Sequence, residues 1–314
     1  MAENCKFIYT FVVTRRNISI LIIMGSLLKV ISKGTLVMTL AAAGTMAYAV
    51  PMRFHCERDT LEVNELLVTG KASGLHTGNA LVTFYAEQLL DRPYVGHTLE
   101  GDEEQLTINI DELDCTTFVE TLYALARTTL EGRTSWRDYA HNLENVRYRS
   151  GKMSDYASRL HYISDWLMDN RSRNNVEEVT ADVKGVRYKI KTINYMSQHR
   201  DSYPSLADST QFAKVRNVEG GYVNHRYPYI RKEALGSKDV ENALRSGDMV
   251  GLVTTMEGLD ISHLGILKKG DDGKLYLLDA SSVGKKVMLE PLPLVEQLRQ
   301  RKSVIGIRVW RLKQ

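Results

Sequence analysis

The hydrophobic period of this 314-residue chain changes along its length, and this change constrains the fold more than any other feature. Apolar residues recur at helical spacing in three early segments, residues 78–90, 115–130 and 154–169. Later segments alternate or form short apolar runs, as strands do, over residues 186–190, 249–255, 261–267, 275–278 and 304–312. A short helix is expected over 292–301. Helices followed by strands predict an α+β fold with an antiparallel sheet.

The composition allows a globular domain and excludes several other classes. With 43% hydrophobic and 25% charged residues, the chain is typical of neither disordered nor fibrous proteins. Five of its 41 basic and one of its 38 acidic residues fall in residues 1–49, so residues 50–314 carry a net charge of −1. A near-neutral body lacks the basic surface that nucleic-acid binding needs. Since no repeat or linker divides it, we predict one domain over residues 50–314 with no nucleic-acid partner.

Residues 1–49 have the pattern of a secretory signal peptide. Lys29 and Lys33 precede an apolar run that closes with small residues, Ala47 and Ala49, at the positions a signal peptidase reads. Met24 would open a signal of ordinary length, so residues 1–23 would reflect an early start codon. The run is too short to span a bilayer. If the signal peptide is cleaved, we expect a periplasmic or cell-envelope protein with no stable membrane insertion. The alternative is that residues 1–49 remain as an N-terminal membrane anchor.

Export makes the remaining cysteines informative, because exposed thiols in an oxidising compartment are usually paired. Only Cys56 and Cys115 would remain after cleavage. Cys115 follows Asp114, a good N-cap residue, at the first position of the helix expected over 115–130. Unpaired backbone N–H groups and the helix dipole favour a thiolate there and could stabilise an oxyanion, so Cys115 is a candidate nucleophile. The alternatives are a buried structural cysteine or a disulfide with Cys56.

A thiolate nucleophile needs an imidazole base and a group that orients the ring. His263 lies in one predicted strand and Asp279 ends the next, so antiparallel pairing could place the carboxylate beside the ring and favour the imidazolium. A core histidine and a turn aspartate are the alternatives. His161 is a rival base, although it could simply pair with Asp165 on a helix face. The chain has no H-E-x-x-H, no C-x-x-C and no glycine-rich phosphate loop, so we expect no metal or other cofactor.

The segment DELDCTTFVE, residues 111–120, resembles the nucleophile motif of the NlpC/P60 cysteine peptidase superfamily. It is most similar to the N-acetylmuramoyl-L-alanine amidase-like branch, formerly a domain of unknown function. Further segments resemble that branch in the same order, namely RPYVGHTLE (92–100), SRLHYISDW (158–166), SGDMVGLVTTMEGLDISHLGIL (246–267), LLDASS (277–282) and GIRVWRL (306–312). The resemblance covers essentially residues 60–314.

The resemblance implies a papain-like NlpC/P60 core, in which the nucleophile begins a helix packed on an antiparallel sheet that carries the histidine. It also implies an exported cysteine amidase that hydrolyses the N-acetylmuramoyl-L-alanine amide bond of peptidoglycan fragments through a thioester during wall turnover. Cys115 would be the nucleophile, His263 the base and Asp279 the orienting residue. Family members often have His-Ala-Ser where this chain has Asp279-Ala280-Ser281, so the third catalytic position departs from the family pattern.

The resemblance also implies residues that bind the substrate. Tyr94 would hold the scissile carbonyl or the oxyanion, unless it is a packed aromatic. Arg159 could bind a peptide carboxylate through its planar fork. Ser158 and Ser281 could contact the sugar or the peptide. For these three residues, solvated surface is the alternative.

Three other functions are compatible with the same residues. A γ-D-glutamyl-diamino acid endopeptidase would cut deeper in the stem peptide with the same catalytic groups. An acyltransferase would form the same thioester and pass the acyl group to an acceptor other than water. A non-catalytic wall-binding module would keep the cleft and lose turnover, although an intact Cys115 and His263 pair counts against it.

Overall fold

The computed structural model of this protein describes residues 7–10 and 50–314. The predicted signal peptide lies outside these residues except for strand β1 (Phe7–Thr10), which pairs antiparallel with β2 (Pro51–Phe54). Strand β3 (Leu106–Ile108) pairs parallel with β2. Within the described ranges, no helix combines the length and the hydropathy that crossing a membrane requires.

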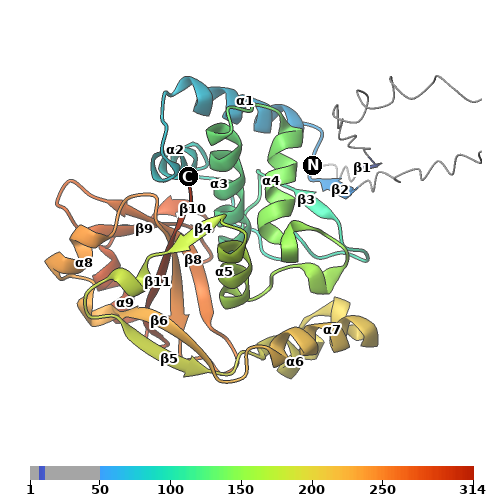
Figure 1. Ribbon diagram of the computed structural model, residues 1–314. Helices are drawn as coiled ribbons and strands as arrows, with labels where there is room; N and C mark the ends of the chain where they lie inside the picture. Colours follow the sequence, from blue (N-terminus) through green and yellow to red (C-terminus); the bar gives the residue numbers. More distant parts are fainter. Residues whose placement is uncertain (1–6, 11–49) are drawn as a thin grey trace, which may run out of the picture.

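The helices of the first half gather around one central helix (Figure 1). Helix α3 (Cys115–Leu130) contacts α1 (Asp59–Ala72), α2 (Gly78–Gln88) and α4 (Trp136–Arg147). Every α3 residue from Thr117 to Ala126 is buried. A helix buried on all sides belongs to the interior of a domain, so α3 is the core of the helical layer.

The second half supplies an eight-stranded sheet in the order β10-β9-β8-β7-β11-β6-β5, with β4 paired to β11. All these pairings are antiparallel. The strands are β4 (Val176–Glu178), β5 (Arg187–Lys191), β6 (His225–Arg231), β7 (Met249–Thr254), β8 (Ile261–Lys269), β9 (Leu275–Ser281), β10 (Lys286–Leu289) and β11 (Val304–Leu312). Helix α3 packs against β8 and β9 and so connects the two halves of the chain.

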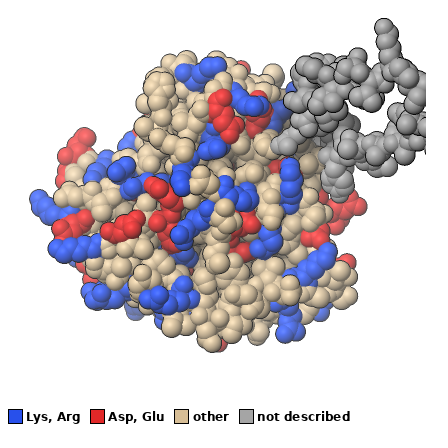
Figure 2. All heavy atoms as spheres, in the orientation of Figure 1, with Lys and Arg blue, Asp and Glu red and all other residues tan. Residues whose placement is uncertain are grey.

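Smaller helices complete the fold. They are α5 (Ile163–Ser172), α6 (Tyr195–Gln198), α7 (Ser209–Gly220), α8 (Lys238–Ala243) and α9 (Leu294–Gln300). Short 3₁₀ turns lie at Arg149–Gly151, Tyr156–Ser158, Thr180–Asp182, Arg200–Ser202, Pro204–Ala207 and Lys232–Ala234. Residues of α8 and α9 pack in a second apolar core with sheet residues, whereas α6 and α7 belong to a third, smaller core. Basic and acidic side chains are interspersed on the face shown in Figure 2, which fits the near-neutral charge of the body.

The mixed fold with its antiparallel sheet is confirmed, as are the helices expected at α2, α3 and α9 and the strands expected at β5, β7, β8, β9 and β11. The apolar periods did not indicate α1, α4, α7 or β6, nor the shorter elements α6, α8, β2, β3, β4 and β10. The helix expected over 154–169 is wrong in its first half. There the Asp155 side chain caps a 3₁₀ turn, Arg159 is extended and bridges Tyr148, and α5 begins only at Ile163. Asp and Ser side chains compete with helical backbone bonds in this way, which an apolar period does not reveal.

A buried ion pair links α3 to α4. The Arg147 Nε donates to Glu120 Oε2 at 2.6 Å, and the two side chains are 2% and 3% exposed. The Trp166 indole of α5 donates to the other Glu120 oxygen, and Arg147 donates to the Thr107 carbonyl of β3. Four elements therefore meet at one pair of buried charges.

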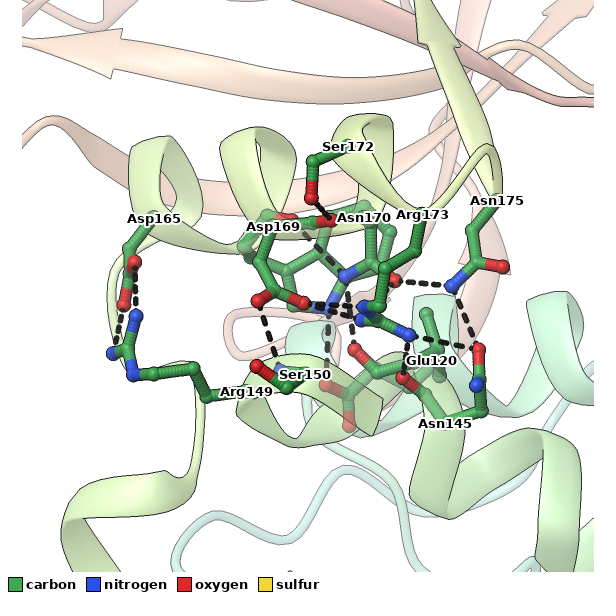
Figure 3. Close-up of polar contacts among 12 residues, drawn as sticks. Glu120, Asn145, Arg149, Ser150, Asp165, Asp169, Asn170, Ser172, Arg173 and Asn175 are labelled. Atoms are coloured by element: carbon green, nitrogen blue, oxygen red, sulfur yellow. Dashed lines mark hydrogen bonds and ion pairs between the residues drawn. The ribbon is translucent and has the colours of Figure 1, made fainter. Parts of the chain in front are cut away.

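A second polar network continues from this pair along α5 (Figure 3). Arg173 donates to the Asn145 carbonyl of α4 at 2.7 Å and to Asp169 one turn earlier at 2.7 Å. Asn175 donates to Asn145 and to Asn170. These bonds between side-chain amides, charges and a backbone carbonyl add polar contacts to the apolar core that α4 and α5 share.

Replacing Arg147 with Ala should lower the free energy of unfolding by about 3–5 kcal/mol, because it leaves the buried Glu120 carboxylate without its counter-charge. Chemical denaturation monitored by circular dichroism measures this loss. Arg133→Ala is the matched control, because Arg133 pairs with Asp138 at the surface, with 59% of its side chain exposed, and its removal should leave the unfolding midpoint unchanged. Equal effects of the two substitutions would contradict the prediction.

Candidate active site

Cys115 occupies the first position of α3, as the sequence predicts. Asp114 is the N-cap, and its Oδ1 accepts hydrogen bonds from the backbone N–H groups of Thr116 and Thr117 at 3.0 and 2.8 Å. Thr117 Oγ1 accepts from the Asp114 N–H and completes a capping box. The Cys115 N–H has no hydrogen-bond partner among the described residues. The helix start is therefore fixed while one N–H beside the thiol stays available.

His263 and Asp279 meet across neighbouring strands β8 and β9. The His263 Nε2 is hydrogen-bonded to Asp279 Oδ2, and the Asp279 side chain is fully buried. Burial alone lowers the pKa of His263, but hydrogen bonds to Asp279 and Cys115 outweigh it and raise this pKa from 6.5 to about 10. With Nε2 occupied, Nδ1 is the ring nitrogen left to face the thiol. The structure thus brings Cys115, His263 and Asp279 into one contact chain.

A glycine lets Asp279 approach the histidine strand. The register of β8 and β9 pairs Ile266 with Leu278, which places Gly265 opposite Asp279. A Cβ on Gly265 would lie 2.9 Å from the Asp279 Cβ and 2.8 Å from the Leu278 carbonyl oxygen. Gly265 is a functional position that was not predicted. The signal that could have revealed it is a glycine inside a strand, which often marks the close approach of another chain segment.

Tyr94 lies close to the thiol. Its N–H donates to the Lys285 carbonyl at 2.9 Å, and its backbone bridges Leu113, two residues before Cys115. Burial and the neighbouring charges of Cys115 and Asp114 raise the pKa of Tyr94. Its hydroxyl therefore stays protonated and can donate a hydrogen bond near the nucleophile.

Ser281 also lies at this site, on the histidine side. Its Oγ donates to Glu290 Oε1 at 3.1 Å and accepts from the Gly284 N–H at 3.1 Å. Together with His263 it lines a cavity of about 290 Å³, whose other lining residues are Ser262, Ser282, Val283, Arg301, Ser303 and Val304.

Ser158 and Arg159 have structural contacts elsewhere. The Ser158 hydroxyl donates to the Asp155 carbonyl at 2.6 Å and closes the capping box of its 3₁₀ turn. Arg159 is 6% exposed and forms ion pairs with Glu100 and Glu104 at 3.1 and 3.3 Å. None of these bonds involves Cys115 or His263. The burial of Arg159 makes the solvated-surface alternative wrong for this residue, and the substrate roles of Ser158 and Arg159 stay predictions.

His161 does not serve as the rival base. Its Nε2 bonds to the Tyr156 carbonyl at 2.8 Å, and burial, with the charge of Arg159, lowers its pKa to about 3. Asp165 pairs with Arg149 at 2.6 Å instead of with His161. His161 precedes α5, so the helix-face pairing expected from the spacing has no helix to support it.

Cys56 and Cys115 are both free thiols, so the alternative disulfide is not formed. Burial and the charge of Asp59 raise the pKa of Cys56, which disfavours a reactive thiolate. Ligand atoms of Cys56, Asp59 and Asp111 lie within 4.8 Å of one another, a spacing that could suit a metal ion. Arg92, however, already donates to Asp111 at 2.5 Å and compensates its charge.

Comparison with known proteins identifies the family. The model of a family described as AmiA-like, N-acetylmuramoyl-L-alanine amidase-like, matches residues 85–307. An N-acetylmuramoyl-L-alanine amidase structure from Bacteroides uniformis is 37% identical, with a TM-score of 0.70, over 76% of this chain and 99% of that one. A Bacteroides fragilis structure named provisionally as a xylanase is 38% identical, with a TM-score of 0.68, over 74% of this chain and 100% of that one. No curated protein matches the chain.

A more distant structure, from Legionella pneumophila, is 20% identical with a TM-score of 0.64, covers 82% of this chain and 95% of that one, and shows the fold alone. The matched family segment includes Tyr94, Cys115, His263 and Asp279. The amidase-like relationship predicted from the sequence is confirmed, whereas the wider NlpC/P60 grouping and the papain-like core stay predictions. The chain therefore belongs to the AmiA-like family of N-acetylmuramoyl-L-alanine amidase-like proteins.

Proposed function

We propose that this protein is a cysteine amidase that hydrolyses the bond between N-acetylmuramic acid and L-alanine in peptidoglycan fragments. The observation that carries the proposal is the contact chain from Cys115 through His263 to Asp279, in a chain of the amidase-like family. The predicted signal peptide is the basis for placing the reaction in the periplasm or cell envelope.

The first half of the reaction uses the thiolate and the helix start. The His263 imidazolium stabilises the Cys115 thiolate, whose sulfur attacks the lactyl carbonyl carbon and forms a C–S bond. The negative charge moves to the carbonyl oxygen, where the Cys115 N–H and the Tyr94 hydroxyl can donate to it. His263 then gives its proton to the leaving amine as the C–N bond breaks, which releases the peptide and leaves a thioester.

The second half returns the enzyme to its starting state. Neutral His263 takes a proton from water while the oxygen attacks the thioester carbonyl. Collapse of this intermediate breaks the C–S bond, releases the lactyl group as a carboxylic acid that loses its proton to solvent, and restores the thiolate beside the imidazolium. Asp279 keeps Nε2 engaged throughout, so that Nδ1 carries the transferred proton.

The site does not favour glycosidase chemistry. Enzymes that cleave xylan ordinarily place two carboxyl groups on either side of the glycosidic bond. Here the Asp279 carboxylate is fully buried and engaged by His263, and the Asp114 carboxylate accepts the N–H groups of Thr116 and Thr117. Identifying the reaction products distinguishes the amidase from the three alternatives, namely a γ-D-glutamyl endopeptidase, an acyltransferase and a wall-binding module.

Replacing Cys115 with Ala should lower turnover by about 10³-fold or more, because no other group can form the acyl intermediate. The assay is mass spectrometry of products from anhydro-N-acetylmuramyl-tripeptide incubated with residues 50–314. Cys56→Ala is the matched control and should retain activity. Free tripeptide and anhydro-sugar identify the amidase, whereas a free diamino acid would identify the endopeptidase. Undiminished activity of the Cys115 variant would refute the thiol mechanism.

Asp279→Asn should move the alkaline limb of kcat/KM to lower pH. Because the folded protein raises the pKa of His263 from 6.5 to about 10, the imidazolium persists until the pH rises through about 10. The stability linked to this shift is fully present below about pH 6.5 and is lost over the same rise. Without the carboxylate that pKa falls, so the imidazolium disappears earlier. A pH profile of kcat/KM, with the alkylation rate of Cys115 by iodoacetamide as a second readout, measures the shift. An unchanged alkaline limb would exclude Asp279 as the group that sustains the imidazolium.

A further inference from the structure

We propose that the cavity beside His263 binds the leaving peptide of the substrate, and that Arg301 binds the first carboxylate of that peptide. This inference rests on the proposed amidase function and names the part of the substrate that this side of the site recognises. The carboxylate in question is the α-carboxylate of the D-glutamate that follows L-alanine.

The cavity is polar and lies at the ends of three strands. It contains the start of β8, the end of β9 and the residues just before β11, in a volume of about 290 Å³. Four serines contribute to its lining, Ser262, Ser281, Ser282 and Ser303. Hydroxyls both donate and accept hydrogen bonds, so this lining suits a polar backbone better than an apolar group.

Arg301 brings an uncompensated positive charge to this lining. Its backbone is held, because its N–H donates to the Leu298 carbonyl at 3.2 Å and its carbonyl accepts from Lys232 Nζ at 3.2 Å. Its guanidinium, in contrast, forms no hydrogen bond or ion pair with any residue in the described part of the chain. Arg308 and Arg311 on the following strand are paired with Glu178 and Asp248. A half-buried arginine that lines a cavity and whose guanidinium is unpaired within the described residues is suited to binding an anion.

The position of His263 assigns the cavity to the leaving group. A general acid must lie within hydrogen-bond reach of the nitrogen that it protonates, so the leaving amine lies against His263. The cavity is lined by His263, whereas Cys115 and Tyr94 are not among its lining residues, so we assign it to the leaving group and not to the acyl group.

The leaving peptide begins with L-alanine at this amine. Its first ionised group is the α-carboxylate of the next residue, D-glutamate, whose γ-carboxyl carries the diamino acid. The planar fork of an arginine matches a carboxylate in a bidentate pair, and serine hydroxyls can bind the intervening amide.

The test uses two N-acetylmuramoyl-tripeptides that differ only in whether the D-glutamate α-carboxyl is free or amidated. The wild type should hydrolyse the free form with a kcat/KM higher by about tenfold to a hundredfold, as expected for a charge-assisted bidentate pair. Arg301→Gln should lower kcat/KM for the free form until the ratio is near one. Arg299→Gln is the matched control, because Arg299 is exposed on α9 two residues earlier and does not line the cavity, and its ratio should equal the wild-type ratio.

Calorimetric binding of the free tripeptide separates this inference from the proposed function. If Arg301→Gln binds the tripeptide about tenfold more weakly than the wild type, the subsite is supported. This holds even if the wild type hydrolyses neither substrate. In that case the amidase proposal fails and the subsite stands. A preference for the free carboxyl that persists in Arg301→Gln would overturn the subsite, as would equal tripeptide affinities of the variant and the wild type.

Discussion

The packing of α3 against β8 and β9 is the constraint on which the candidate site depends. Cys115 comes from the helical half of the chain and His263 from the sheet half, so their contact exists only because these halves share one core. Fully burying an apolar side chain such as Phe118, Leu122 or Leu125 contributes about 1.5–3 kcal/mol relative to exposure. The apolar body of α3 thus supplies the free energy that holds its polar first residue at the sheet.

Two buried ion pairs determine how neighbouring elements are oriented within this packing. Glu120 and Arg147 orient α4 on α3, and His263 and Asp279 connect β8 to β9. Such pairs contribute little net stability, since desolvation offsets much of their attraction, but loss of one partner leaves a costly unpaired charge. One oxygen of Asp279, Oδ1, is buried without a hydrogen-bond partner in the described region, so its charge depends largely on His263. The same dependence sustains the imidazolium that the thiolate needs.

Much of the fold and the centre of the site could be predicted from the sequence, because the relevant signals are local. The start of α3 follows from Asp114 and the apolar period behind it, and the alternation of β8 and β9 follows from their residues. Prediction failed where a period had two structural explanations. Residues 154–169 have helical spacing, but Asp155 and Ser158 satisfy the backbone locally and break the helix there. The sequence also did not show that Arg159 is buried and forms ion pairs with two glutamates from a loop distant in the chain.

The sequence by itself determined the helix that begins at Cys115, the strands that carry His263 and Asp279, and the resemblance that led to the family. These depend on capping, side-chain periodicity and motif order, which act between residues close in the chain. Only the tertiary structure decided that His263 bonds Asp279 while His161 bonds a backbone carbonyl, and that Gly265 makes room for the carboxylate. It also decided that the Arg301 guanidinium pairs with none of the described residues while Arg308 pairs with Glu178. The physical reason is that burial and charge pairing depend on neighbours distant in sequence, which only the packed core brings together.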